Sequence, residues 1–511
     1  MRCVSFCSCD GNKSHKYTQK FGNAQLRNCF LSNFVSKMER GTIKQQRAFY
    51  LASILLPDVI RMVLKPDGQQ QHSQSHFLMS LNELYELYLS HPIITTDTRN
   101  CPEGSIFFAL KGDNFDGNLF AHEALEKGCA HAVVDNPQIA GSDGRMVYVS
   151  NVLLMLQELA HHHRKQLALP IVQITGTNGK TTTKELTAAV LAKRYKVLFT
   201  EGNFNNHIGV PKTLLRLTED HEIAVIETGA NHPGEIADLS KIVAANSGLI
   251  TNVGKAHLEG FGSLEGVVQT KCELYQYLAT QPDGFIFLNG DNTLLAPHAK
   301  GLRAITYGKP GEGYDVEGEV VSCSPQLRLR LRLAGGNWRE VQTQLVGAYN
   351  LDNMLAAAAV GLRYGVSEAD ICDALEAYTP KNKRSELQQT PYNTLIVDAY
   401  NANPTSMKAA LENFHLIPHP NKLLILGEMR ELGSASAEEH AAIVALLQEL
   451  EFTNVWLVGK EFAAVASGKQ FRCFDNVETV KEELTWNPIS DSLILVKGSN
   501  GTKLFQLPEF L

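Results

Sequence analysis

The sequence lacks a long hydrophobic run and an excess of positive charge. No uninterrupted apolar stretch reaches the roughly 18 residues that a membrane-spanning helix needs, so we predict no stable membrane insertion. Lys and Arg number 47 against 54 Asp and Glu, which gives a formal net charge of −7 at pH 7. Because no basic excess is available to neutralise phosphates, a nucleic-acid partner is not expected. The composition is that of a globular protein, which we predict to be cytoplasmic.

The cysteines also lack an organised pattern. No two of the ten stand in a CxxC arrangement, which in a chain of 511 residues favours reduced thiols. Cys3, Cys7 and Cys9 lie close together near the N-terminus, but their spacing matches no standard set of metal ligands. Metal binding there is therefore the less favoured alternative.

The first 78 residues differ in composition from the rest. They contain 11 Lys and Arg against 4 Asp and Glu, and they end in the polar stretch "DGQQQHSQSH". They lack the order of segments that defines a secretory signal, although an organelle-targeting peptide is an alternative. Met79, followed by "SLNELYELY", looks like a natural start. We therefore predict that residues 1–78 form an N-terminal extension, disordered or non-native, that carries none of the chemistry.

Patterns of strands and helices divide the remaining chain into three α/β domains. Residues 79–168 contain short strands and helices, and "VLLMLQELAHHHRKQL" reads as a connecting helix. Residues 169–380 alternate strands with helices, which predicts a mostly parallel sheet covered on both faces, with "LRLRLRLA" and "VQTQLV" as an antiparallel excursion. A polar linker at 379–386 marks the boundary with the third domain, residues 381–511. The pattern of that domain is typical of a smaller Rossmann-like sheet.

The stretch "VQITGTNGKTTTKEL", residues 172–186, points to a nucleotide. Gly176 and Gly179 let backbone amides converge on an anion, Lys180 adds a positive charge, and a following threonine hydroxyl can ligate Mg²⁺. The motif is the short GxxGKT form, because Ile174 stands where the longer form needs glycine. A chance turn is the alternative. The strand-like residues before the motif and the helical ones after it favour a triphosphate site, and hence a central P-loop ATPase domain.

Three further polar residues follow buried strands. Glu227 in "VIETGANHPGEI" could supply an oxygen ligand to Mg²⁺ on ATP phosphates, although a strand-end glutamate is more often a helix cap or an ion-pair partner. His257 and Lys271 follow the next strand, where the alternatives are a hydrogen-bonded cleft histidine and a solvated helix lysine. The run His161–His163 is predicted to be a solvated helix end rather than a metal site, because adjacent helix residues point in different directions.

Eight motifs then occur in a recognisable order: "GTNGKTTT", "GNFNNHIGVP", "ETGANHPGEI", "AHLEGFGS", "YNLDNMLAAAA", "DAYNANPTSM", "LGEMRELG" and "VKGS". Together they resemble the Mur ligases, the ATP-dependent amino-acid-adding enzymes of peptidoglycan synthesis. "GNFNNHIGVP" and "DAYNANPTSM" are most similar to the members that join D-alanyl-D-alanine to UDP-N-acetylmuramoyl-tripeptide. The resemblance runs from about Met79 to near the C-terminus.

The resemblance implies ATP and Mg²⁺ as cofactors and assigns residues to them. The implied nucleotide contacts are Gly176, Thr177, Asn178, Gly179, Lys180, Thr181, Thr182, Asn350, Asn353, Arg384 and Asp398. The implied metal ligands are Thr181, Glu227 and His257, and the implied catalytic residues are Lys180, Glu227, His257 and Lys271, the last matching a lysine that several members carbamylate. Two departures stand out: Tyr349 replaces a frequent histidine, and Asp398 lacks the second acid that the family commonly has beside it.

The resemblance also assigns substrate contacts. It places a UDP-sugar on the first domain, against Thr98, Arg99, Lys111, Gly112, Asp116 and Gly117, and the peptide against Asn205 and Asn206. The Arg99 fork suits a diphosphate because it gives paired hydrogen bonds. An ordinary surface turn explains "KGDNFDGN" as well, and "NFNN" alone reads as an ordinary loop.

The implied chemistry is ligation through an acyl phosphate, with UDP-N-acetylmuramoyl-tripeptide and D-alanyl-D-alanine as the bound partners of a predicted monomer. One alternative is a sister ligase that adds the third peptide residue, although the "DNPR"-type motif of those enzymes is missing, or one that adds glutamate to folate. The other is a phosphate-loop switch without ligase activity, which leaves the first and third domains unexplained.

Overall fold

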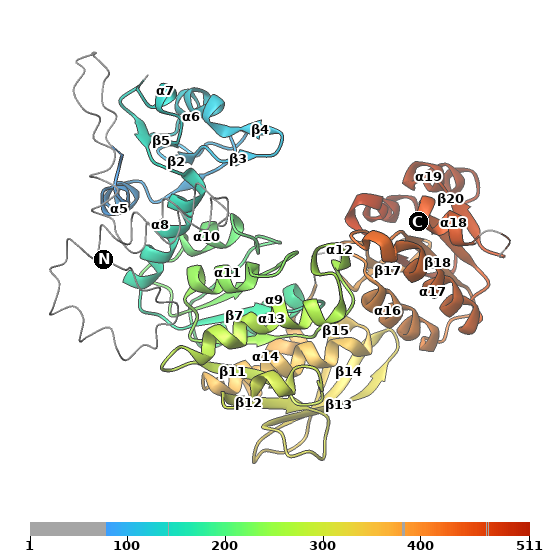
Figure 1. The fold of residues 1–511 in the computed structure, drawn as a ribbon. Helices are drawn as coiled ribbons and strands as arrows, with labels where there is room; N and C mark the ends of the chain where they lie inside the picture. Colours follow the sequence, from blue (N-terminus) through green and yellow to red (C-terminus); the bar gives the residue numbers. More distant parts are fainter. Residues whose placement is uncertain (1–77, 142, 381–383, 467, 469) are drawn as a thin grey trace, which may run out of the picture. The chain divides into compact units, whose positions relative to one another are not determined.

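Three sheets of different size follow one another along the chain, which confirms the predicted α/β class (Figure 1). The computed structural model describes residues 78–141, 143–380, 384–466, 468 and 470–511. The predicted N-terminal extension, with Cys3, Cys7 and Cys9, therefore lies outside the described residues except for Leu78.

The first sheet is small and parallel, with the strand order β1-β2-β5-β6. Its strands are β1 (Ile94–Thr95), β2 (Ile106–Phe108), β5 (His131–Val134) and β6 (Met146–Tyr148), and a hairpin of β3 (Lys111–Gly112) and β4 (Phe115–Asp116) follows β2. The helices are α5 (Leu81–Ser90), α6 (Ala121–Glu126), α7 (Pro137–Ala140) and α8 (Val152–Gln166). Helix α5 begins after Ser80, because Ser80 and Glu83 form a capping box.

Helix α8 connects the first sheet to the middle one, as its sequence predicted. Leu156 and Leu159 on this helix are fully buried. They belong to a hydrophobic core that contains Phe108 of the first sheet as well as Ile171 and Ala224 of the middle one. The two sheets therefore share one core around α8.

The prediction of a solvated helix end at His161–His163 is wrong for His163. Its side chain is only 6% exposed, and its Nε2 lies 2.9 Å from the carbonyl oxygen of Leu217. Its Nδ1 lies 3.3 Å from the hydroxyl of Tyr85 on α5. The last turn of α8 packs between two other segments instead of ending in solvent. In the described part of the chain no three His, Cys, Asp or Glu side chains are grouped to hold a metal, so the metal alternative gains no support.

The middle sheet has nine strands in the order β15-β14-β13-β12-β11-β10-β7-β9-β8, and it is parallel from β13 to β8. The strands are β7 (Ile171–Thr175), β8 (Val197–Phe199), β9 (Ile223–Glu227), β10 (Ser247–Ile250), β11 (Phe285–Asn289), β12 (Arg303–Gly308), β13 (Val316–Cys323), β14 (Gln326–Leu333) and β15 (Arg339–Val346). The helices are α9 (Lys180–Leu191), α10 (Gly209–Leu214), α11 (Glu235–Val243), α12 (Leu258–Phe261), α13 (Leu264–Ala279), α14 (Leu351–Arg363) and α15 (Glu368–Ala377).

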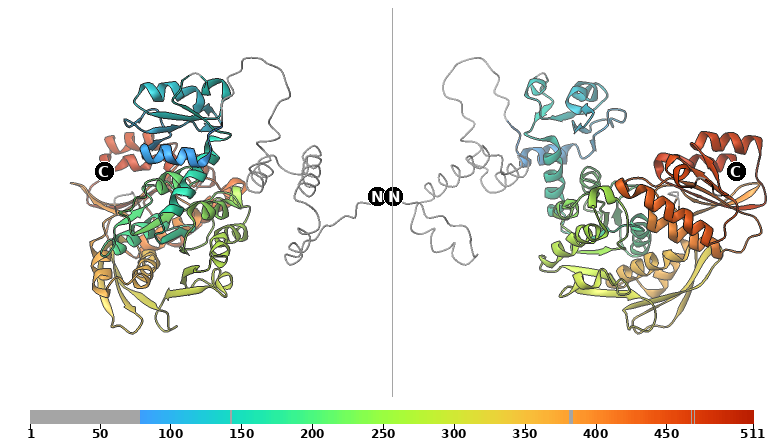
Figure 2. Two further views of the ribbon diagram at one scale, coloured as in Figure 1. Left: turned by 90° about the vertical axis from the view of Figure 1, so that its left-hand side faces the viewer. Right: turned by 45° about the vertical axis from the view of Figure 1, so that its right-hand side comes forward.

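Both faces of this sheet are buried, as its continuous apolar strands predicted (Figure 2). Ile174 and Leu249 pack with α9 and α14 on one face. Ile250 and Ile286, one residue out of phase, pack with α13 on the other. Because strand side chains alternate between faces, this period of two decides which residues pack on each face, and the parallel pairing of β7 with β9 and β10 brings the loops after these strands to one edge of the sheet.

The antiparallel excursion is confirmed at the β13–β15 end of the sheet. Strand β14 alternates fully buried leucines with half-exposed arginines, as "LRLRLRLA" predicted. The arginines pair with glutamates of the neighbouring strands: Arg328 with Glu340, Arg330 with Glu319 and Arg332 with Glu317. These pairs explain why so basic a strand carries no free positive patch.

The third sheet has six strands in the order β16-β17-β21-β18-β19-β20, parallel except for β16. The strands are β16 (Glu386–Gln389), β17 (Asn393–Asp398), β18 (Lys422–Gly427), β19 (Val455–Val458), β20 (Arg472–Phe474) and β21 (Ser492–Lys497). The helices are α16 (Pro404–Leu416), α17 (Ser436–Glu449), α18 (Lys460–Ala466) and α19 (Val477–Trp486). Residues 381–383 of the predicted linker lie outside the described residues.

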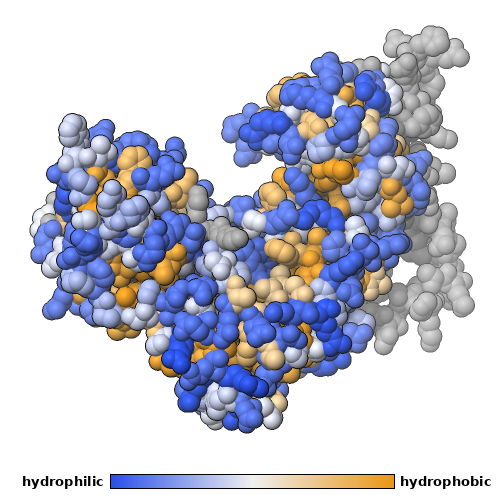
Figure 3. All heavy atoms as spheres, turned by 180° about the vertical axis from the view of Figure 1, so that it is seen from behind, coloured by the Kyte–Doolittle hydropathy of each residue, from blue (hydrophilic) through white to orange (hydrophobic). Residues whose placement is uncertain are grey.

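Every helix in the described ranges is too short or too polar to cross a lipid bilayer. On the face drawn in Figure 3, apolar patches are interspersed with hydrophilic ones. The most exposed large hydrophobic side chains, such as Trp486, Leu416 and Leu119, come from separate elements.

Candidate active site

The GxxGKT stretch forms the predicted loop between a strand and a helix. It leaves β7 at Thr175 and enters α9 at Lys180. Gly176 and Gly179 have φ values of 144° and 78°, a range in which residues with a Cβ are strained. A Cβ on Gly179 would also lie 2.4 Å from Oδ1 of Asn353. Both glycines are therefore required by the backbone path, which turns the start of α9 toward the space where an anion would bind.

Lys180 is held next to this loop by two carbonyl groups. Its Nζ donates to the carbonyl oxygens of Gly176 at 2.8 Å and Thr177 at 2.9 Å. Burial lowers the pKa of Lys180 to about 8, while the nearby Glu227 carboxylate opposes the shift. The ammonium form therefore predominates at pH 7, as the interaction with phosphate oxygens requires.

Thr181 and Glu227 each present a buried oxygen that has no partner. Thr181 Oγ1 and Glu227 Oε2 make no hydrogen bond to any described residue. Glu227 ends β9 and is in register with Ile174 of the adjacent β7, so it lies at the edge of the sheet from which the loop departs. An unpartnered buried oxygen is costly unless something binds it. A buried hydroxyl and a buried carboxylate, both without a partner in the described chain, suit a hard divalent cation such as Mg²⁺.

The two asparagines of "NFNN" play different roles. Asn205 Nδ2 donates to Glu227 Oε1 at 2.7 Å, which fixes the carboxylate and leaves Oε2 free. Asn206 instead accepts backbone N–H groups of Ile208 and Gly209 at the start of α10, at 3.1 and 2.9 Å. The Asn205 side chain therefore contacts Glu227, whereas the Asn206 side chain stabilises the turn that begins α10.

Lys271 is buried, which rules out the alternative of a solvated helix lysine. Its side chain is 2% exposed on α13, with Nζ 3.4 Å from the carbonyl oxygen of Ala230 and 5.2 Å from the ring centre of Phe261. Burial and then the positive charge of Lys180 lower the pKa of Lys271 to about 7. A large fraction of this amine is thus uncharged at neutral pH, which is the reactive form.

His257 lies opposite a carboxylate of the third domain. Its Nδ1 is 2.5 Å from Oε2 of Glu431, and this contact lowers the pKa of the Glu431 carboxyl. Both residues adopt left-handed backbone conformations, with φ values of 50° and 62°. The structure therefore pairs His257 with a residue that was not among the predicted site residues.

Asn178 is fixed on both its backbone and its side chain. Its backbone N–H donates to Asn252 Oδ1 at 2.9 Å, and its carbonyl oxygen accepts from Thr251 Oγ1 at 2.6 Å. Its side-chain amide pairs with that of Asn403, which begins α16 in the third domain. The predicted nucleotide contact of Asn178 thus comes with an inter-domain contact that the sequence did not indicate.

Asn350 and Asn353 support the loop from α14. Asn353 Oδ1 accepts from the hydroxyl of Thr183 at 3.0 Å, and Asn353 Nδ2 donates to Asn350 Oδ1 at 2.9 Å. Asn350 Nδ2 donates to the carbonyl oxygen of Val346. Both asparagines are buried, and both lie within reach of the loop helix.

The third domain contributes Arg384 and Asp398. The Arg384 guanidinium lies 3.9 Å from the ring centre of Tyr400, which holds it by a cation–π contact. Asp398 ends β17, and its Oδ2 accepts from Nζ of the buried Lys497 at 2.5 Å. The neighbouring acid that the family commonly has is absent, and Lys497 is the charge partner of Asp398.

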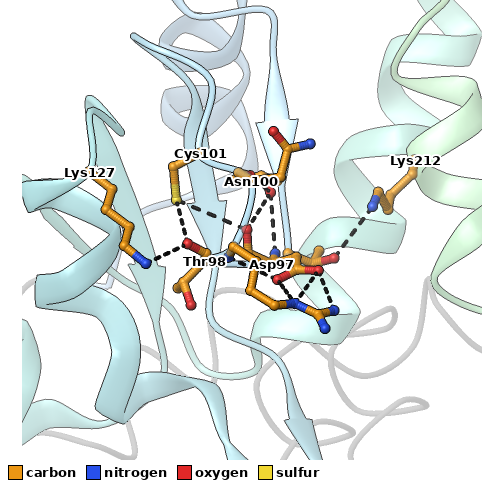
Figure 4. Close-up of polar contacts among 9 residues, drawn as sticks. Asp97, Thr98, Asn100, Cys101, Lys127 and Lys212 are labelled. Atoms are coloured by element: carbon orange, nitrogen blue, oxygen red, sulfur yellow. Dashed lines mark hydrogen bonds and ion pairs between the residues drawn. The ribbon is translucent and has the colours of Figure 1, made fainter.

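In the first domain, the loop 96–101 forms a compact polar turn (Figure 4). Arg99 folds back onto Asp97, and Nζ of Lys127 donates to the carbonyl oxygen of Thr98 at 3.0 Å. Lys212, from the middle domain, reaches Thr96 Oγ1 at 3.4 Å. Three cationic side chains thus lie around Thr98, and Lys127 and Lys212 were not predicted.

The β3–β4 hairpin places the other predicted sugar-nucleotide residues. Lys111 pairs with Asp135 at 2.7 Å, and Asp116 accepts from the backbone N–H of Asn118 at 2.9 Å. A Cβ on Gly117 would lie 2.3 Å from the carbonyl oxygen of Leu110, so the turn itself requires this glycine. The two explanations of "KGDNFDGN", a turn and a ligand site, are thus compatible.

Comparisons with known proteins agree with this geometry. Three family models match successive stretches: "Mur ligase family, catalytic domain" at residues 92–164, "Mur ligase middle domain" at 174–361, and "Mur ligase, glutamate ligase domain" at 383–500. The chain therefore belongs to the Mur ligase family, whose three domains account for its three sheets.

Individual similar proteins indicate one activity within the family. The UDP-N-acetylmuramoyl-tripeptide–D-alanyl-D-alanine ligase of Bacillus subtilis is 35% identical over 83% of this chain and 94% of its own. The crystal structure of MurF from Acinetobacter baumannii superposes with a TM-score of 0.74 at 33% identity, covering 81% of this chain and 92% of the other. The MurF ligase of Thermotoga maritima, solved with ADP, gives a TM-score of 0.73 at 25% identity, covering 83% and 97%.

Proposed function

We propose that this protein is an ATP-dependent ligase that joins D-alanyl-D-alanine to UDP-N-acetylmuramoyl-tripeptide. The observation that carries the proposal is the combination of a glycine loop, a half-buried ammonium and two buried oxygens without a partner among the described residues, all near one edge of the middle sheet. Two relatives named for that activity align with this chain over nearly their whole length. Both substrates and ATP are soluble metabolites, so we expect a cytoplasmic enzyme, active as a monomer.

The first step is activation of the tripeptide carboxylate. A carboxylate oxygen attacks the γ-phosphorus of ATP, a P–O bond to ADP breaks, and an acyl phosphate forms. The loop amides and the Lys180 ammonium bind the phosphates and offset the negative charges that must approach each other. In the second step the neutral amine of D-alanyl-D-alanine attacks the acyl carbon, and inorganic phosphate leaves.

Mg²⁺ fits this site, because Thr181 Oγ1 and Glu227 Oε2 are buried oxygens without a hydrogen-bond partner in the described chain. These residues would hold it, and when bound it would supply charge neutralisation between the phosphates and the carboxylate. Asn205 orients the Glu227 carboxylate for this purpose. His257 would serve a second ion only after leaving Glu431.

The remaining predicted residues bind and orient the substrates. Arg384, which stacks on the Tyr400 ring, and Asp398, which pairs with Lys497, would contact the nucleotide. Thr98, Arg99 and the β3–β4 hairpin would bind the UDP-sugar. Because a large fraction of the Lys271 amine is uncharged at neutral pH, it is suited to carbamylation, which would convert a buried amine into an anion.

The test is purified full-length protein with ATP, Mg²⁺ and UDP-N-acetylmuramoyl-tripeptide, with phosphate release measured against four acceptors. We expect rapid release with D-alanyl-D-alanine and a product heavier by that dipeptide. Single D-alanine, diaminopimelate and lysine serve as controls and should give only background. Slow release that ignores the acceptor would instead indicate a nucleotide switch. Ligation of diaminopimelate or lysine to UDP-N-acetylmuramoyl-dipeptide, supplied in place of the tripeptide, would indicate a sister ligase.

A further inference from the structure

The side chain of Asn178 connects the phosphate loop to the third domain. The backbone of Asn178 is already held by Thr251 and Asn252, the residues that follow β10. Its side chain is therefore not needed to shape the loop. Instead, Asn403 Nδ2 donates to Asn178 Oδ1 at 2.7 Å, and Asn178 Nδ2 donates back to Asn403 Oδ1 at 3.4 Å. Asn403 is buried and Asn178 is partly buried, so the pair is partly shielded from competing water.

Asn403 has a second, separable role. Its Oδ1 accepts the backbone N–H of Ser406 at 2.9 Å and so caps the N-terminus of α16. A serine can cap a helix as well as an asparagine can, but its hydroxyl is too short to reach a second amide across the domain boundary. Capping and loop contact can therefore be separated by one neutral substitution.

Further contacts near this pair join the segment after β10 to the third domain. The backbone N–H of Lys255 donates to Thr405 Oγ1 at 3.1 Å, and Nζ of Lys255 pairs with Glu439 at 2.5 Å. A Cβ on Gly254 would lie 2.8 Å from Thr405 Oγ1, which shows how closely the first turn of α16 approaches the segment after β10. The Asn178–Asn403 pair is the member of this group that reaches the phosphate loop itself.

We infer that Asn178 and Asn403 are positioning residues that couple the phosphate loop to the third domain. This inference rests on the proposed function. Arg384 and Asp398 belong to the same domain as Asn403, so the amide pair fixes their position relative to the phosphates that the loop binds. Because coupling between two sites is reciprocal, loss of the pair weakens nucleotide binding even when the substitution lies in the third domain.

The experiment compares Asn403→Ser with Asn476→Ser in the full chain. Asn476 caps α19 in the same domain, by accepting N–H groups of Glu478 and Thr479, so it is a matched control for capping. We expect Asn403→Ser to lower kcat about fivefold, the effect of one neutral hydrogen bond, with KM for the tripeptide and Tm unchanged. Asn476→Ser should leave kcat and ADP affinity at wild-type values. Asn403→Thr, a neutral substitution that also preserves the cap, replaces Asn403→Ser if that variant proves unstable.

A double-mutant cycle with Asn178→Ala separates a pair from two independent contacts. We expect Asn178→Ala and the double variant to lose about the same kcat and the same ADP affinity as Asn403→Ser alone. Additive losses, or an Asn403→Ser enzyme within twofold of wild type, would overturn the inference. ADP affinity by calorimetry is measured in every variant. If the wild type fails to ligate D-alanyl-D-alanine, the proposed function falls, while the cycle in ADP affinity still decides whether the two asparagines are coupled.

Discussion

Lys497 Nζ lies 2.5 Å from Asp398 Oδ2, and the two residues end adjacent parallel strands in matching register. Lys497 is 1% exposed, so its charge has been removed from water and depends on this partner. Lys497 was not a predicted site residue, although it stands in the quoted "VKGS". The pair explains how Asp398 keeps a fixed position without a neighbouring acid.

Lys497→Met is therefore expected to destabilise the protein by about 3 kcal/mol, because it leaves a largely buried carboxylate without its cation. The measurement is urea unfolding followed by circular dichroism. The double variant Asp398→Asn, Lys497→Met should recover much of the loss, since neither charge then remains. A double variant that is as unstable as the sum of the singles would show that the pair itself contributes little.

Gly179→Ala should disrupt the phosphate loop in two ways. Its φ of 78° costs about 1–2 kcal/mol for a residue with a Cβ, and the added atom would meet Asn353 at 2.4 Å. Gly234→Ala is the matched control, because Gly234 begins α11 with a φ of 89° and open space around its Cβ position. We expect a comparable loss of Tm from backbone strain in both variants, but loss of ADP binding only in Gly179→Ala. Normal ADP affinity in Gly179→Ala would contradict the role of the loop.

Thr181→Val should lower turnover about a hundredfold and raise the Mg²⁺ concentration needed for half-maximal rate, because it removes the proposed cation ligand. Thr187 lies two turns later on α9, and its hydroxyl is likewise buried without a partner in the described structure. Thr187→Val should leave turnover unchanged and stability equal or higher, since an unsatisfied hydroxyl is lost. Equal kinetics in the two variants would mean that Thr181 is an ordinary core threonine.

The buried amine of Lys271 predicts a pH-dependent stability. Its pKa is about 7 in the folded protein, well below the ordinary value near 10.5 of the unfolded chain. Between these values the unfolded state binds more protons, so stability rises with pH across this window. The gain in unfolding free energy from Lys271→Met should therefore be largest near pH 7 or below and shrink toward pH 10. Denaturant titrations at four pH values check this; a gain that is independent of pH would place the amine in contact with water.

The sequence predicted those parts of the site that are continuous along the chain. The loop Gly176–Thr182, the strand end at Glu227 and the order of helices and strands follow from local patterns and needed no tertiary information. The burial of Lys271 and His163 could not be read in this way, because each lies on an amphipathic helix whose partner is far away in sequence.

The site residues that could not be predicted from the sequence contact residues far away along the chain. Asn403 and Glu431 meet Asn178 and His257 only after the third domain has folded. Lys212 reaches Thr96 from another domain. Asn403 stands in the quoted motif "DAYNANPTSM". That motif indicates the substrate class but does not predict the contact with Asn178.

The core around α8 has a consequence for dissecting the chain. Residues of the first sheet and of the middle segment fill it together, so neither can complete its interior without the other. A fragment truncated after residue 168 would expose the apolar side of α8 to water, and we expect it to aggregate or be degraded when expressed alone. Biochemists who wish to isolate the first domain should therefore retain the whole middle domain through α15, because β7 also pairs with β10 and packs against α14.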